Sequence, residues 1–156
     1  MGISTSVNER IGEIVFDFPP VNAFDDKTWN EIPNIITEMG KRQDVRVIII
    51  RSEGRGFCAG VDIKQLAETS SAIVEVNKGN YETFKAIRGC EIPVISAPHG
   101  YVIGGGIGMC GASDVVIAAD DCFFSLPEVD RGAMGGAAHL QRMVGMPKMR
   151  AAFFTG

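Results

Sequence analysis

A nearly continuous β-branched run at residues 45–51 constrains the fold of this chain more than any other segment. Five of its seven residues are valine or isoleucine. Such runs are typical of parallel strands that are covered on both faces. A helical apolar pattern precedes the run and a glycine-rich loop follows it. The segment therefore predicts a buried strand in an α/β fold.

Strand-like and helix-like segments alternate along the rest of the chain. We expect further strands at residues 13–18, 93–97, 114–119 and 122–125, the third of them buried. We expect helices at residues 25–39, 63–67, 71–88, 107–112, 137–144 and 147–154. Strands joined by crossover helices imply an α/β fold with a largely parallel sheet, whose ligand site lies in loops after the strand ends. Two glycine-rich loops, residues 54–60 and 100–106, occupy such positions.

Length and charge limit the kinds of partner. At 156 residues, 46% of them hydrophobic, the chain is expected to form one domain over residues 1–156. A formal net charge of -4 without a long basic run argues against nucleic-acid and anionic-membrane partners. No segment approaches about 18 consecutive apolar residues, and no basic region precedes an apolar stretch at the N-terminus. A cytoplasmic protein without a membrane partner is expected.

The cysteines and histidines do not form a metal-binding pattern. The four cysteines show no Cys-x-x-Cys spacing, so reduced and mostly buried thiols are expected. The two histidines, His99 and His139, do not lie at metal-ligand spacing from cysteines or acids. We expect His99 to stabilise a turn and His139 to pack on a helix or lie at the surface. No metal site is expected.

The backbone amides of the Gly104 to Gly106 turn are candidates for binding an oxyanion. A thioester carbonyl that becomes an enolate needs donors aimed at the developing charge, and backbone N–H groups on a tight turn supply them. Glycine at Gly105 is expected to let substrate approach the backbone, beside the positive end of a helix dipole. A plain tight turn is the alternative. A dinucleotide-binding loop is excluded, because the third glycine of Gly-x-Gly-x-x-Gly is missing.

Five segments in one order resemble the crotonase (enoyl-CoA hydratase/isomerase) family. They are PPVNA at residues 19–23, FCAGVDIK at 57–64, GYVIGGG at 100–106, SD at 113–114, and FSLPE at 124–128 with Gly132. The resemblance implies an α/β fold with a crotonase-like ββα-type core and a largely parallel sheet. Members of the family typically extend well beyond Gly156. Residues 1–156 are therefore expected to be the N-terminal catalytic core of an incomplete domain, with the C-terminal helical part missing.

The resemblance also implies the site. The oxyanion hole would come from the amides of Val61 and Gly105, and the Ala59-Gly60 backbone and Lys64 would lie beside coenzyme A. Coenzyme A is part of the acyl-CoA substrate, so no separate cofactor is expected. Lys64 has an equal alternative as a solvated helix residue. The full-length protein is expected to form a homotrimer or hexamer.

The carboxylates depart from the family pattern. Hydratases of the family have two glutamates, but Gly108 stands at the position of the first, and Glu128 matches the second. We expect Glu128 to be the acid/base, with a raised pKa in a desolvated site. The alternative is a loop carboxylate that pairs with Arg131 or caps a helix. Gly104 and Gly108 are expected to line the acyl site, where Gly108 would leave room for a bulky substrate.

A single carboxylate is compatible with several functions. Concerted hydration asks for two groups, whereas double-bond isomerisation and hydrolytic carbon–carbon cleavage of a cyclic β-keto acyl-CoA need one base and an oxyanion hole. The segment at residues 104–136 looks like actinobacterial crotonase homologues that open a steroid-derived ring. Apolar residues near the end of the chain, among them Phe153 and Phe154, leave a non-catalytic interaction subunit as a further alternative.

Overall fold

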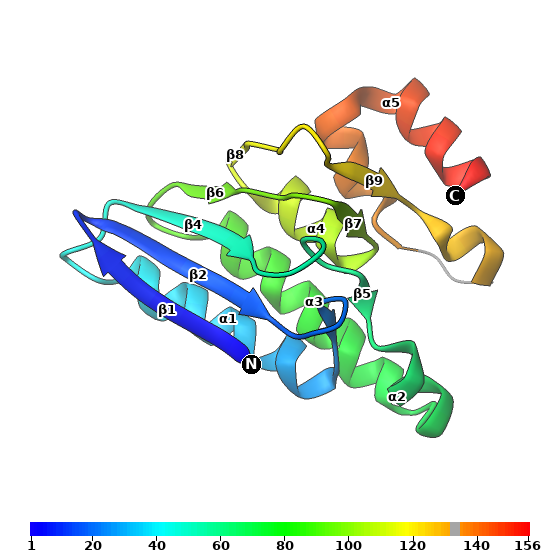
Figure 1. The fold of residues 1–156 in the computed structure, drawn as a ribbon, viewed down its shortest axis with the longest axis horizontal. Helices are drawn as coiled ribbons and strands as arrows, with labels where there is room; N and C mark the ends of the chain where they lie inside the picture. The colour runs from blue at the N-terminus through cyan, green and yellow to red at the C-terminus, as the bar shows by residue number, and fades with distance from the viewer. Residues whose placement is uncertain (132–134) are drawn as a thin grey trace.

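The computed structural model describes residues 1–131 and 135–156, without the side chain of Arg131. Gly132, the last residue of the family pattern, lies outside the described part of the chain. Strands and helices alternate as expected (Figure 1). The elements are β1 (Gly2–Asn8), β2 (Ile11–Asp17), β3 (Ala23–Phe24), α1 (Asp26–Gly40), β4 (Val47–Ser52), β5 (Gly60–Val61), α2 (Ile63–Glu68), α3 (Ala72–Arg88), β6 (Val94–Ser96), β7 (Tyr101–Ile103), α4 (Gly105–Ala112), β8 (Val115–Val116), β9 (Phe123–Ser125), the 3-10 helix η1 (Pro127–Arg131) and α5 (Ala137–Thr155).

The main sheet has five strands in the order β1-β2-β4-β6-β8. All neighbours in it are parallel except β1 and β2, which pair antiparallel. The largely parallel sheet of an α/β fold is therefore confirmed. The pairs β3-β5 and β7-β9 form two further small parallel sheets. Strand β1 was not expected from the sequence, because the polar stretch GISTSVN lacks an apolar pattern and depends on β2 for its pairing.

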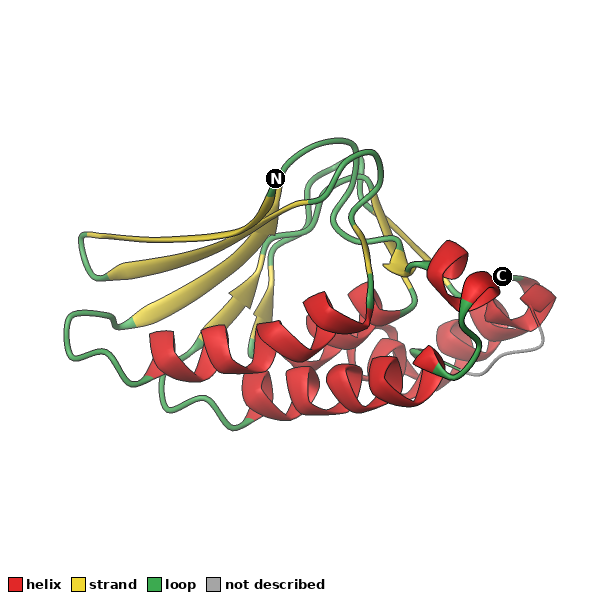
Figure 2. Cartoon of the chain, turned by 90° about the horizontal axis from the view of Figure 1, so that it is seen from below, coloured by secondary structure: helices red, strands yellow, loops and turns green. Residues whose placement is uncertain are grey.

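Helices α1 and α3 form a layer on one side of the main sheet (Figure 2). Trp29 of α1 is fully buried, and its ring meets that of Phe24 at 5.2 Å between centroids. Strand β4 alternates between buried and half-buried residues, so Ile48 and Ile50 face the core and Ile49 faces away. The predicted buried strand is therefore confirmed for one face, while the other face is half-buried, because the helical layer covers only one of them.

The segment expected as a buried strand at residues 114–119 is a short edge strand. Only Val115 and Val116 pair, and their one partner is β6. Val115 is 47% exposed and Ile117 is 61% exposed. Apolar composition suggested burial, but the position at the sheet edge decides exposure.

The helix ends follow local signals. Asp25 caps α1 by accepting the Thr28 N–H at 2.8 Å, and the helix continues through Pro33. Two helices were expected at residues 137–144 and 147–154, and α5 indeed breaks at Gly145, where φ is 76°. No helix in the described part of the chain is long and apolar enough to cross a membrane.

Candidate functional site

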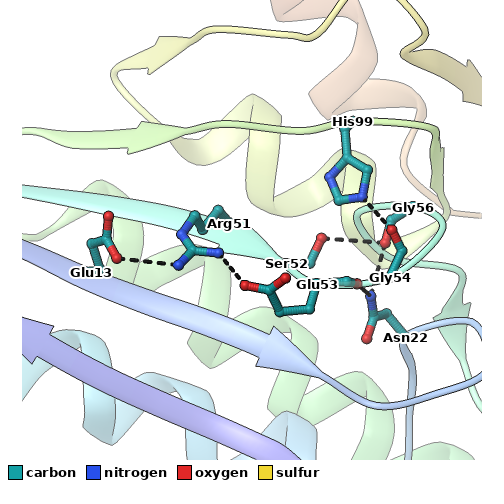
Figure 3. Close-up of polar contacts among 8 residues, drawn as sticks. All are labelled: Glu13, Asn22, Arg51, Ser52, Glu53, Gly54, Gly56 and His99. Atoms are coloured by element: carbon teal, nitrogen blue, oxygen red, sulfur yellow. Dashed lines mark hydrogen bonds and ion pairs between the residues drawn. The ribbon is translucent and has the colours of Figure 1, made fainter.

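The first glycine loop, residues 54–60 after β4, is held by polar contacts from other segments (Figure 3). The Asn22 side-chain amide donates to the carbonyl oxygens of Glu53 and Gly56, both at 2.8 Å. His99 Nε2 lies 2.9 Å from the carbonyl oxygen of Gly54. The expected turn-stabilising role of His99 is confirmed. The loop is therefore fixed from two other segments of the chain rather than by its own sequence.

The two glycine loops meet, as the resemblance implied. The Ile103 N–H donates to the Cys58 carbonyl oxygen at 2.9 Å. Gly60 has a φ of +83°, and a Cβ placed on it would lie 3.6 Å from the backbone nitrogen of Gly105. Val61 directly follows the first loop and Gly105 lies in the second, so the two amides expected to form an oxyanion hole come from adjoining segments. Ala59 is anchored beside them, since its N–H donates to the Asn22 carbonyl oxygen at 3.0 Å.

Helix α4 starts at the triple glycine, and its tight packing explains two of the glycines. A Cβ on Gly105 would lie 2.5 Å from Trp29 Cζ2 and 2.7 Å from Asn80 Oδ1. A Cβ on Gly106 would lie 2.9 Å from Cys58 Cβ. Gly105 was expected to be glycine so that substrate could approach the backbone. The structure adds another reason, since Trp29 fills the space where its side chain would be.

Glu128 lies directly against the triple glycine. It sits in the first turn of η1, after β9. A Cβ on Gly104 would lie 3.0 Å from Glu128 Oε1, and one on Gly135 would lie 2.8 Å from the same oxygen. The structure therefore brings together Glu128, Gly104 and Gly105 from segments that are more than twenty residues apart in the sequence.

The surroundings of the Glu128 carboxyl are poor in partners. Burial raises its pKa above the ordinary value, and a hydrogen bond from its own backbone N–H lowers it by less. Its Oε2 is buried and has no hydrogen-bond partner among the described residues. Such an oxygen is unfavourable in a folded protein unless it has a function or a bound partner. The alternative ion pair with Arg131 stays a prediction, because that side chain is not described.

Gly108 does not leave open space. It is buried in α4, and a Cβ on it would overlap Cζ and Cε1 of Phe84 and lie 2.7 Å from Cε2. The expectation of room for a bulky substrate beside Gly108 is therefore not met, because the aromatic ring from α3 already fills the space.

Lys64, in the first turn of α2, lines a shallow cavity of about 310 Å³. Pro19, Pro20 and Asp62 also line this cavity, so two of the family segments meet there. An aspartate directly before a helix predicts an N-cap, and Asp62 indeed caps α2 by accepting the Lys64 N–H at 2.9 Å. The Lys64 side chain is exposed and is free to reach an anionic group in the cavity.

The remaining candidates have structural positions. The His139 ring packs at a tilt against Phe84 with ring centroids 4.7 Å apart, which confirms helix packing. Burial and the nearby arginines lower the pKa of His139. Cys58 is fully buried, and burial raises its pKa to about 12, so its thiol is inert. In the described ranges, no three His, Cys, Asp or Glu side chains are grouped to hold a metal ion.

Sequence reasoning missed the aromatic layer behind the triple glycine. Trp29 and Phe84 come from α1 and α3, and their ring centroids lie 6.4 Å apart. Both sit on apolar helix faces, which sequence alone cannot tell from ordinary core. No local signal could have linked Phe84 to Gly108, because their contact depends on how α3 packs against α4.

Comparison with known proteins places this chain in a family. The family model for enoyl-CoA hydratase/isomerase matches residues 6–156. An enoyl-CoA hydratase of Bacillus anthracis has a TM-score of 0.91, with 25% sequence identity over 100% of this chain and 63% of its own.

Two curated relatives are more similar in sequence. Both are named (7aS)-7a-methyl-1,5-dioxo-2,3,5,6,7,7a-hexahydro-1H-indene-carboxyl-CoA hydrolase. The protein of Mycobacterium tuberculosis is 46% identical over 97% of this chain and 62% of its own length. The protein of Rhodococcus jostii is 45% identical over 99% of this chain and 61% of its own length. The chain thus spans less than two thirds of these relatives, and it belongs to the enoyl-CoA hydratase/isomerase (crotonase) family.

Proposed function

We propose that this chain carries the catalytic core of an acyl-CoA enzyme that opens a ring of a cyclic β-keto acyl-CoA by hydrolysis. The substrate class is a steroid-derived, fused-ring thioester. The observation that carries the proposal is one carboxylate at the triple glycine among the residues that the structure describes: Glu128 lies against Gly104, whereas Phe84 occupies the space beside Gly108. One base and an oxyanion hole suffice for this reaction.

The reaction needs one water molecule and a base. Glu128 takes a proton from water as the water oxygen adds to the ring ketone carbon. The bond from that carbon to the α-carbon of the thioester then breaks, and its electron pair forms an enolate with its charge on the thioester oxygen. The amides of Val61 and Gly105 stabilise this charge. Glu128 returns the proton to the α-carbon, which leaves a new carboxylic acid and an intact thioester.

The raised pKa of Glu128 suits both proton transfers. A carboxylate in water is too weak a base for this step, and burial strengthens it. Similarity supports the choice of reaction, because two relatives at 46% and 45% identity are named as hydrolases of a bicyclic dioxo-indene-carboxyl-CoA. The exposed Lys64, on the cavity that it shares with Pro19 and Pro20, is suited to hold the anionic part of coenzyme A.

The test is mass spectrometry of products from three thioesters: a cyclic β-keto acyl-CoA, a 2-enoyl-CoA and a 3-enoyl-CoA. We expect the cyclic substrate to gain the mass of one water while the thioester stays intact. Glu128→Gln should lower this turnover by about 10²- to 10⁴-fold while leaving CoA-ester binding nearly unchanged. Release of free coenzyme A thiol, or full activity of Glu128→Gln, would contradict the proposal.

Double-bond isomerisation is the second candidate. It is favoured by the same observation, since one carboxylate can remove and return a proton on an enolate held in the oxyanion hole. The thioester panel separates the two functions. Conversion of the 3-enoyl-CoA without a change in mass, with no reaction of the cyclic substrate, would support isomerisation instead.

A further inference from the structure

The ring of Phe84 stands where a side chain at position 108 would be. Gly108 is buried in α4, and a Cβ there would overlap Phe84 Cζ and Cε1. Position 108 therefore cannot carry any side chain, and least of all a carboxylate, while Phe84 keeps its present place.

Phe84 is held on two sides by other rings. The Trp29 ring meets it edge-on at 6.4 Å between centroids, and the His139 ring lies 4.7 Å away on α5. Trp29 is fully buried and packs closely on Gly79 and Gly105, where added Cβ atoms would lie 2.7 Å from its Cβ and 2.5 Å from its Cζ2.

The backbone of His139 is closely packed as well. A Cβ on Gly111 would lie 2.5 Å from the His139 carbonyl oxygen and 2.7 Å from its Cβ, so α5 packs directly on α4. The three rings of Trp29, Phe84 and His139 thus form one row behind α4. Phe84 is the middle ring, which limits its rotation into another position.

We propose that Phe84 is a specificity-determining residue that keeps this site to one carboxylate. It excludes a second acid/base group from position 108 and replaces it with an apolar ring, so that neither a carboxylate nor an ordered water bound to it can act from that side of α4. The site then favours acyl-CoA substrates whose reaction needs one base over 2-enoyl thioesters that need two. The substrate part of this statement rests on the proposed function, and the steric part does not.

A stability cycle tests the steric part without any substrate. The variants are Gly108→Ala, Phe84→Ala and the double variant, compared with the unchanged chain by thermal unfolding. We expect Gly108→Ala alone to lower Tm by roughly 3 to 10 °C, or to prevent folding. The double variant should unfold at a higher temperature than the sum of the two single shifts predicts. A double variant whose Tm is no higher than the sum of the two single Tm shifts predicts would overturn the proposal.

A second pair of variants tests the consequence for catalysis. Gly108→Glu is compared with Phe84→Ala/Gly108→Glu for addition of water to crotonyl-CoA, with Phe84→Ala as the matched control. We expect the double variant to be at least about tenfold more active than either single variant, because a positioned acid/base group contributes about 10²- to 10⁴-fold. Equal activities with a coupled stability cycle would confine Phe84 to packing and overturn the specificity claim. Loss of ring opening on Glu128→Gln is measured separately, so failure of the proposed function is distinguishable.

Discussion

Glu128 and Gly104 share one small space: a Cβ on Gly104 would lie 3.0 Å from Glu128 Oε1. The glycine comes from the turn between β7 and α4, and the carboxylate from η1 after β9. Strands β7 and β9 pair in parallel, so their carboxyl ends deliver both residues to the same place. This pairing makes the carboxylate part of the glycine site.

Substitution of Gly104 tests both its backbone conformation and its contact with Glu128. Gly104 has a φ of +53°, which an alanine adopts only with strain of about 1 to 3 kcal/mol. Gly104→Ala should lower stability by that amount and also displace the Glu128 carboxylate, so that kcat falls at least about tenfold. Gly54→Ala is the matched control, because Gly54 has a φ of +84° and no atom near its Cβ position. If both variants lose kcat equally, contact with Glu128 is not the cause.

The activity should depend on the ionisation of Glu128. Because burial raises its pKa, kcat/KM should fall on acidification with a midpoint above 4.5, the ordinary value for a glutamate. A pH–rate profile on a cyclic β-keto acyl-CoA measures the midpoint. A midpoint at or below 4.5 would contradict a buried base.

Stability should show the same ionisation with a defined sign. A folded-state pKa above the unfolded one means that the folded protein binds the proton more tightly. The stabilising contribution is therefore complete below pH 4.5 and is lost as pH rises through the raised pKa. The Tm of Glu128→Gln minus the Tm of the unchanged chain should therefore increase from pH 4 to pH 8. Glu38→Gln, on an exposed position of α1, serves as control and should show a smaller change over the same range.

Asn22 should be essential for the first glycine loop. Its side chain accepts the Phe18 N–H at 2.8 Å and donates to the carbonyl oxygens of Glu53 and Gly56. Asn22→Ala leaves the Phe18 N–H and the Glu53 carbonyl oxygen without this partner, while Ser52 Oγ still donates to the Gly56 carbonyl oxygen at 3.2 Å. We therefore expect a loss of about 2 to 4 kcal/mol in the free energy of unfolding. Asn34→Ala, at an exposed position of α1, should change it by less than about 0.5 kcal/mol. Equal effects in urea titrations would contradict this role.

Lys64 should contribute to coenzyme A binding through its charge. It is exposed on the cavity near the start of α1, so its contact with a phosphate is worth about 1 kcal/mol. Lys64→Ala should therefore weaken binding of a CoA ester about fivefold, and the difference should shrink at high salt. Lys41→Ala is the control, because Lys41 lies at the opposite end of α1. Calorimetric titration that shows the same affinity for both variants would assign Lys64 to the solvated surface.

Local patterns were sufficient for most elements. The β-branched run predicted β4, and apolar spacing predicted α1 to within one residue of its ends. The long polar segment at residues 71–88 predicted α3 equally well. The capping role of Asp62 is also a local feature, because an aspartate before a helix accepts a backbone N–H wherever that helix lies. Such features depend on neighbours in the sequence.

The sequence by itself also determined which atoms could act: glycine amides for an oxyanion and a glutamate in a loop. Only the tertiary structure decided what surrounds them. It placed Glu128 on Gly104, buried one face of β4 rather than two, and filled the space at Gly108 with Phe84. A glycine in a sequence shows that a side chain is missing, but it does not show what takes its place. What takes its place is decided by the packing of helices that are distant in the sequence. Here the Phe84 ring fills the space beside Gly108 that was expected to hold substrate.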